Sequence, residues 1–181
     1  MSNTILLAVA LQRWEQHSAH ALAARDVAAA LARGASKHLH VLSVYAYESI
    51  NTNGLPPAVA AKYRDEQIQR LDACMQRKMA AYVAPLEDAG VRVSTLLLVG
   101  EAREVVVQVI PEVKAELLIM GSRSNRSLWD ITRGGTAQQV IKRAPCPVLL
   151  VSANNGSAKN GLGVASRECP KESIDKTSMR I

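Results

Sequence analysis

The chain has 181 residues, of which 48% are hydrophobic, and a formal net charge of +6, which suits one globular domain with its own core. Only 3% of the residues are aromatic and the charges are spread along the chain, without the basic stripe or stacking aromatics typical of nucleic-acid-binding proteins. No apolar run approaches the roughly 20 residues that span a bilayer, and strand-like sequence begins at Thr4, which leaves no room for a signal peptide. We therefore expect a cytoplasmic protein that binds neither nucleic acids nor membranes.

Apolar runs and helical stripes alternate along the first 152 residues. We predict strands at residues 4–10, 40–45, 91–99, 117–120 and 148–151, and helices at residues 17–33, 58–89, 101–113 and 136–143. Strands that alternate with helices imply a parallel sheet with right-handed crossovers. The sequence therefore predicts an α/β protein, a three-layer α/β/α sandwich around a five-stranded parallel sheet.

Caps and breakers mark the predicted helix ends. Ser18 is a suitable N-cap for the first helix. Gly34 is expected to end that helix and Gly90 the second, because glycine adopts the left-handed conformation that follows many helices. Pro111 lacks a backbone donor, so it should kink the third helix or end it early.

The composition changes after Ser152. Residues 153–181 are rich in Ser, Asn, Gly and Lys, and their few large apolar side chains have no period. We predict a domain at residues 1–152 followed by a mostly disordered tail. A tail that docks on a partner or on the domain is the alternative.

Candidate metal ligands and acid–base groups are few. The histidines form two pairs, His17 with His20 and His38 with His40, and neither pair has a cysteine or carboxylate at the spacing of a metal site. We therefore predict no metal site. His17 and His20 are the only acid–base candidates, because the serines of the later loop have no histidine or carboxylate beside them in the sequence.

The segment from Leu117 to Val151 has the pattern of a phosphate-binding loop. An apolar strand is followed by a loop that begins at Gly121 and ends at Gly134 and Gly135, and a short helix comes next. The free N–H groups and positive dipole end of such a helix favour an anion.

Four motifs in order carry a resemblance to a known family. They are ILLAV at residues 5–9, the turn at Val99 and Gly100, LLIMGSR at residues 117–123, and RAPCPVLLV at residues 143–151. With them, residues 3–152 resemble the universal stress protein family. The resemblance implies a Rossmann-like fold of the adenine-nucleotide alpha-hydrolase type with strand order 3-2-1-4-5. Ligands of such sheets bind beyond the strand carboxyl ends where the order reverses, here between the first and fourth strands.

Members of that family that bind ATP carry the pattern G-x-x-G-(nine residues)-G-S/T in this loop. They also have an aspartate after the first strand that holds the base. Here Gly121 and Gly134 match, and the spacing is kept. The nucleotide or phosphate site that the resemblance implies consists of Ala10, Val99, Gly100, Gly121, Arg123, Ser124, Gly134, Gly135 and Thr136.

Three positions of that site depart from the pattern. Ala10 replaces the aspartate, Ser124 the second glycine and Gly135 the Ser or Thr, although Thr136 follows one place later. A lost charge-assisted bond is worth roughly 1.5–3 kcal/mol, and a serine forced into the left-handed region costs roughly 1 kcal/mol. Together about 3–5 kcal/mol of recognition is in doubt, enough to turn micromolar binding into millimolar. Arg123 and its neighbouring arginines either attract an anion or simply face water.

The two tryptophans, Trp14 and Trp129, lie in the two loops expected to face each other at this point. In a first group of roles, the tryptophans would line a pocket, stack on a base or close the site. In a second group, they would cover apolar surface or contact a partner. Intrinsic fluorescence that responds to nucleotide would support the first group.

Two functions remain open on the sequence. In the favoured one, the chain is a stress-response homodimer that pairs through its last strand, from Val148 to Val151, acts through unknown protein partners and has a partly degenerate nucleotide site. In the alternative, it binds ATP or AMP through the loop from Gly121 to Thr136, with Mg²⁺ accompanying ATP. In neither is it an enzyme beyond slow incidental ATP hydrolysis.

Overall fold

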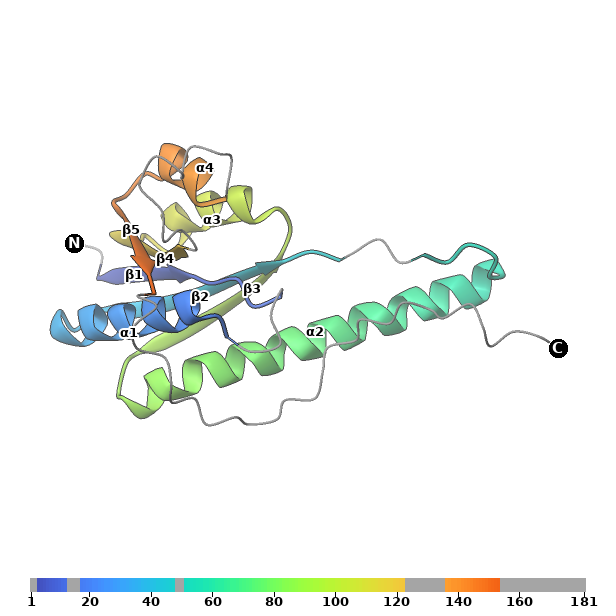
Figure 1. Cartoon of the computed structure of the whole chain (residues 1–181), viewed down its shortest axis with the longest axis horizontal. Coiled ribbons are helices and arrows are strands. Elements are labelled where there is room, and N and C mark those ends of the chain that lie inside the picture. Colours follow the sequence, from blue (N-terminus) through green and yellow to red (C-terminus); the bar gives the residue numbers. More distant parts are fainter. Residues whose placement is uncertain (1–2, 13–16, 48–50, 123–135, 154–181) are drawn as a thin grey trace.

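Parallel strands and helices alternate along the chain in the computed structural model, which describes residues 3–12, 17–47, 51–122 and 136–153 (Figure 1). Within these residues the elements are β1 (Thr4–Ala8), α1 (Ala19–Gly34), β2 (His38–Tyr45), α2 (Pro57–Asp88), β3 (Val93–Val99), α3 (Ala102–Glu112), β4 (Leu117–Ser122), α4 (Thr136–Arg143) and β5 (Val148–Ser152). The residues predicted as a tail lie outside this part except for Ala153, so their predicted disorder stays a prediction.

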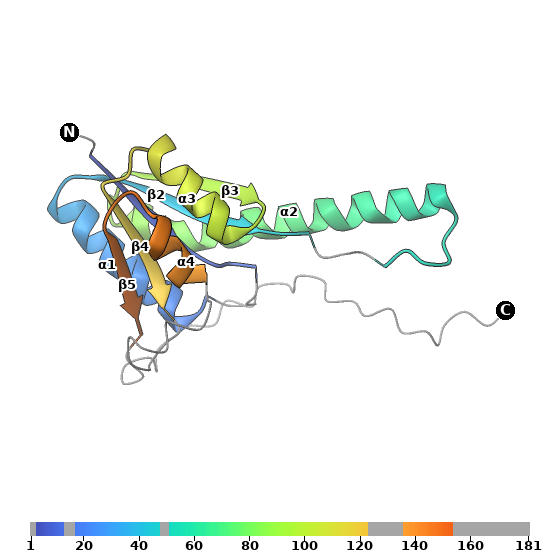
Figure 2. The same ribbon diagram turned by 90° about the horizontal axis from the view of Figure 1, so that it is seen from above.

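The sheet has the order β3-β2-β1-β4-β5, and all four pairings are parallel. Helices α1 and α2 pack on one face, and α3 and α4 pack on the other (Figures 1 and 2). The predicted three-layer α/β/α sandwich and its strand order are therefore confirmed. Among the described helices, none combines the length and apolar character that a membrane span requires.

Strand β1 lies at the centre of the sheet and is covered on both faces. Ile5 and Leu7 pack against α1 and α2, while Leu6 and Ala8 pack against α3 and α4. A strand buried on both faces has no polar side to alternate with, which explains its continuous apolar run. Because all pairings are parallel, the carboxyl ends of the five strands meet at one edge of the sheet.

The helix and strand ends lie within two residues of the predicted ones. Ser18 caps α1 as predicted, since its Oγ accepts a hydrogen bond from the Ala21 N–H at 3.2 Å. Gly34, however, is the last residue of α1 rather than its stop, and the left-handed residue is Ser36, with φ 51°. Strand β4 also continues past the predicted end, because Gly121 pairs in register with Val151 of β5.

Helix α2 is much longer than the strands. Its second half carries the buried side chains Met75, Met79, Tyr82 and Leu86, whereas Ala60 is the one buried residue in its first four turns. Both views show this first half running out past the strand carboxyl ends (Figures 1 and 2).

Candidate functional site

The predicted site lies where the strand order reverses, at the carboxyl ends of β1 and β4. These strands pair from Ile5 with Leu117 to Ala8 with Met120. Ala10 follows β1 and is exposed, Gly121 lies in β4, and Thr136 is the exposed first residue of α4. Outside the described residues lie Arg123, Ser124, Gly134, Gly135, Trp14 and Trp129, whose predicted roles stay predictions.

Gly121 is in close contact with the first turn of α1. A Cβ atom at Gly121 would lie 3.0 Å from the backbone oxygen of His20 and 3.4 Å from the His20 Cβ. A side chain here would crowd the backbone of α1 and force it to shift by a few tenths of an ångström, so packing gives its own reason for the residue that matches the first glycine of the phosphate-loop pattern. That match therefore says nothing by itself about a ligand.

His20 also connects the start of α1 with the end of the sheet. Its Nδ1 accepts a hydrogen bond at 3.1 Å from the backbone N–H of Ala153, directly after β5. His20 thus has a structural contact on each side, through its backbone to Gly121 and through its ring to Ala153. His20, one of the two acid–base candidates, therefore has a structural role at this edge of the sheet.

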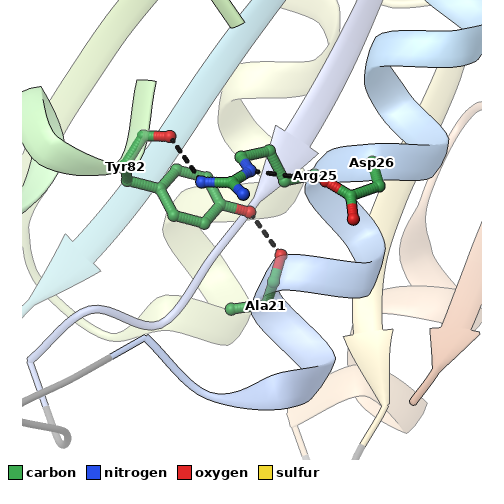
Figure 3. Close-up of polar contacts among 4 residues, drawn as sticks. All are labelled: Ala21, Arg25, Asp26 and Tyr82. Atoms are coloured by element: carbon green, nitrogen blue, oxygen red, sulfur yellow. Dashed lines mark hydrogen bonds and ion pairs between the residues drawn. The ribbon is translucent and has the colours of Figure 1, made fainter. Parts of the chain in front are cut away.

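Tyr82 joins α2 to α1 near the same edge (Figure 3). Its side chain is 0% exposed, and its hydroxyl donates a hydrogen bond to the carbonyl oxygen of Ala21 at 2.6 Å. The guanidinium of Arg25 lies 5.6 Å from the ring centroid, and it pairs with Asp26 at 3.5 Å. Burial raises the pKa of Tyr82, so the phenol remains a donor.

His17 belongs to the same cluster. Its ring meets the edge of Tyr82 at a centroid distance of 5.1 Å. Burial lowers the pKa of His17, and the positive charges of Arg25 and Lys78 lower it further. His17 is therefore a neutral ring packed on an aromatic side chain at neutral pH, which accounts for the second acid–base candidate.

The turn at Val99 and Gly100 follows β3, which lies two strands away from β1. Gly100 has φ 151°, and a Cβ there would come within 2.9 Å of the Val105 side chain. Its N–H donates to the carbonyl oxygen of Tyr45 at 2.9 Å, which holds the turn to the end of β2. The sheet thus separates this turn from Gly121 by two intervening strands.

A side-chain hydrogen bond from Arg103 joins α3 to α4. Its NH1 atom donates to the Gln139 side chain at 3.3 Å, and its Nε lies 3.4 Å from a carboxylate oxygen of Glu101. Glu101 occupies the N-cap position of α3, near the positive end of its dipole, and its side chain makes no capping bond. The first turn of α4 is therefore linked to α3 through one side-chain contact.

Two contacts at the end of β2 were not predicted from the sequence. The Gln12 side chain donates through Nε2 to the carbonyl oxygen of Ala46 at 2.6 Å, and its Oε1 accepts from the Ala46 N–H at 3.0 Å. The hydroxyls of Tyr45 and Tyr47 both donate to Oδ1 of Asp72, at 2.8 and 3.0 Å. The only signal for the first contact is strand register, which becomes visible once β1 and β2 are paired.

No group of three or more histidine, cysteine, aspartate or glutamate side chains that could hold a metal ion occurs among the described residues.

The model of the universal stress protein family matches residues 1–152. A universal stress protein from Thermus aquaticus is 34% identical over 155 residues, which cover 83% of this chain and 99% of that protein. A universal stress protein family protein from Arabidopsis thaliana, solved with AMP bound, has a TM-score of 0.61 at 18% identity and covers 84% of this chain and 93% of its own. A universal stress protein from Archaeoglobus fulgidus, solved in complex with dAMP, has a TM-score of 0.54 at 21% identity, with 81% and 95% covered. This chain belongs to the universal stress protein family.

Proposed function

We propose that this chain is a cytoplasmic stress-response homodimer that acts through protein contacts and binds adenine nucleotides only weakly. The observation that carries the proposal is Ala10, an exposed methyl group at the carboxyl end of β1, at the position where the resemblance to ATP-binding family members implies an aspartate. A methyl group offers no hydrogen bond to a base or a ribose. The loss removes roughly 1.5–3 kcal/mol of binding free energy, which corresponds to about 10- to 100-fold in affinity.

Calorimetric titration with AMP and with ATP plus Mg²⁺ tests this proposal. The wild-type protein should bind with a dissociation constant near the millimolar range. The Ala10→Asp variant should bind roughly 10- to 100-fold more tightly, because the carboxylate restores a charge-assisted bond. Ala10→Asn is the matched control, since it has nearly the same shape without the charge and should gain much less. Micromolar binding by the wild-type protein, or ATP or AMP that copurifies and is identified by mass spectrometry, would contradict the proposal.

The second candidate is a nucleotide-binding protein that uses the loop from Gly121 to Thr136, with Mg²⁺ when the ligand is ATP. It is supported by the structural neighbours solved with AMP, dAMP and cAMP. The exposed start of α4 at Thr136 also supports it, because the N-terminus of a helix favours an anion. The copurification experiment decides between the two candidates.

The homodimer is proposed through β5, the edge strand beside β4. Edge strands present unpaired N–H and C=O groups, and Leu149 is 36% exposed in the middle of this one. Pairing β5 with its copy across a two-fold axis would satisfy these backbone groups and cover the Leu149 side chain. Neighbouring side chains of β5, Val148 and Leu150, already pack against the α3 and α4 layer.

Sedimentation velocity of the Leu149→Lys variant tests the interface. The wild-type protein should sediment as a dimer at micromolar concentration, and the variant as a monomer, because the ammonium group would be desolvated in the interface. Val99→Lys is the matched control, since Val99 is 47% exposed in β3, the opposite edge strand. A monomeric wild-type protein, or equal dissociation of both variants, would argue against pairing through β5.

A further inference from the structure

The backbone of Ala46 faces β1 at a place where the β1 backbone no longer pairs with β2. Strands β1 and β2 pair in register up to Ala8 with Leu42, and the last ladder bond runs from the Val9 N–H to the Leu42 carbonyl at 2.9 Å. The same offset of 34 residues brings Gln12 opposite Ala46, but there the side chain of Gln12 makes both bonds. The segments that follow β1 and β2 have thus separated enough for a carboxamide to fit between them.

On the side of β2 that faces β3, the last backbone carbonyl of the strand already has a hydrogen-bond partner. The Tyr45 carbonyl faces β3 and accepts the Gly100 N–H, so by strand alternation the N–H and C=O of Ala46 face β1. A backbone donor and acceptor side by side, at the carboxyl edge next to the switch point, form the kind of edge that reads a planar ligand. Ala10 lies only two residues before Gln12 on the same segment.

The chemistry of Gln12 matches that of one nucleobase. Its carboxamide presents a donor to the Ala46 carbonyl and an acceptor to the Ala46 N–H. Adenine presents the same neighbouring pair on its Watson–Crick edge, with the N6 amino group as donor and N1 as acceptor. We propose that the Gln12 side chain occupies the base-reading edge of Ala46 in place of adenine, so that the protein closes its own base site.

Tyr47 supports the same ligand class. It is adjacent to Ala46, and the residue is 39% exposed. The ring is held in place by the bond from its hydroxyl to Asp72 and by an edge contact with Tyr45 at 5.9 Å. An exposed and fixed aromatic ring is a platform on which a base can stack. An adenine that displaced Gln12 would therefore find a ring beside the edge that reads it.

The inference rests on the proposed function and names a second cause of weak binding, independent of Ala10. Calorimetric titration of Gln12→Ala with AMP should give at least about tenfold tighter binding than the wild-type protein, because two hydrogen bonds no longer compete with the base. Inosine monophosphate is the control ligand, since its O6 acceptor and N1–H donor reverse the pattern and it should gain little. An unchanged affinity for AMP, or an equal gain for both nucleotides, would overturn the inference.

A second measurement keeps the test independent of the variant's folding. In the wild-type protein, NMR titration with AMP should shift the Gln12 side-chain NH₂ signals and the Ala46 amide signal together, whereas inosine monophosphate should not. Signals that stay unmoved at saturating AMP would overturn the inference. Micromolar binding of AMP by the wild-type protein would instead overturn the proposed function, and the ratio between variant and wild type would still decide the role of Gln12.

Discussion

Replacing Tyr82 with alanine is expected to lower the free energy of unfolding by about 3–5 kcal/mol, the range found for buried aromatic residues. The side chain is 0% exposed, and it contacts α1 through the Ala21 carbonyl, Arg25 and His17. Truncation would leave a cavity between α1 and α2 and would remove the side-chain hydrogen bond to the Ala21 carbonyl, which keeps its partner within the helix. Urea unfolding followed by circular dichroism measures the change.

Tyr82→Phe separates the ring of Tyr82 from its hydroxyl. Phenylalanine keeps the packing and the edge contact with His17 but removes the 2.6 Å bond to Ala21. The Ala21 carbonyl keeps its partner within α1, so the expected loss is about 0.5–1.5 kcal/mol, the net contribution of one hydrogen bond. If Phe and Ala destabilise the protein equally, the hydroxyl rather than the ring holds the two helices together, and the packing explanation is wrong.

Replacing Gly121 with valine should lower the free energy of unfolding by about 1–3 kcal/mol in the complete absence of nucleotide. The new Cβ would lie 3.0 Å from the backbone oxygen of His20, so α1 would have to move away from β4. Backbone atoms cannot swing aside as a flexible side chain can. Thermal and urea unfolding of the ligand-free protein measure the change.

Gly34→Ala is the matched control for Gly121→Val. A Cβ at Gly34 would have no atom within 4 Å, and Gly34 is the last residue of α1. Alanine there should leave stability unchanged or raise it slightly, since alanine is the better helix former. If Gly121→Val is as stable as the wild-type protein, Gly121 is not there for packing, and a role in ligand binding becomes the better explanation.

The sequence predicted most of the fold for reasons that the structure makes plain. The continuous apolar run of β1 reflects burial on both faces, and α4 begins and ends at the predicted residues. The strand order came from the family motifs, because periodicity gives elements but not their neighbours. The first helix ends at Gly34, close to the predicted position, but the left-handed residue of the turn is Ser36 rather than the glycine.

The candidate site was only partly predictable. Ala10 and Gly121 were assigned to the correct edge of the sheet by the motif spacing. The sequence could not show that Gly121 admits the backbone of His20, or that Gln12 binds Ala46, because each contact joins segments that are far apart in the chain. Such contacts depend on the distance between packed elements, which single-residue patterns do not encode.

The length of α2 has a consequence for local unfolding of the protein. The half of α2 that carries Met75, Met79 and Leu86 shares the core, whereas the half near Pro57 extends past the sheet. Few apolar contacts oppose local fraying there, so backbone amides near Pro57 should exchange with solvent deuterium through openings far smaller than global unfolding. The molecule would thus have a rigid body and a more labile arm, both belonging to one continuous helix.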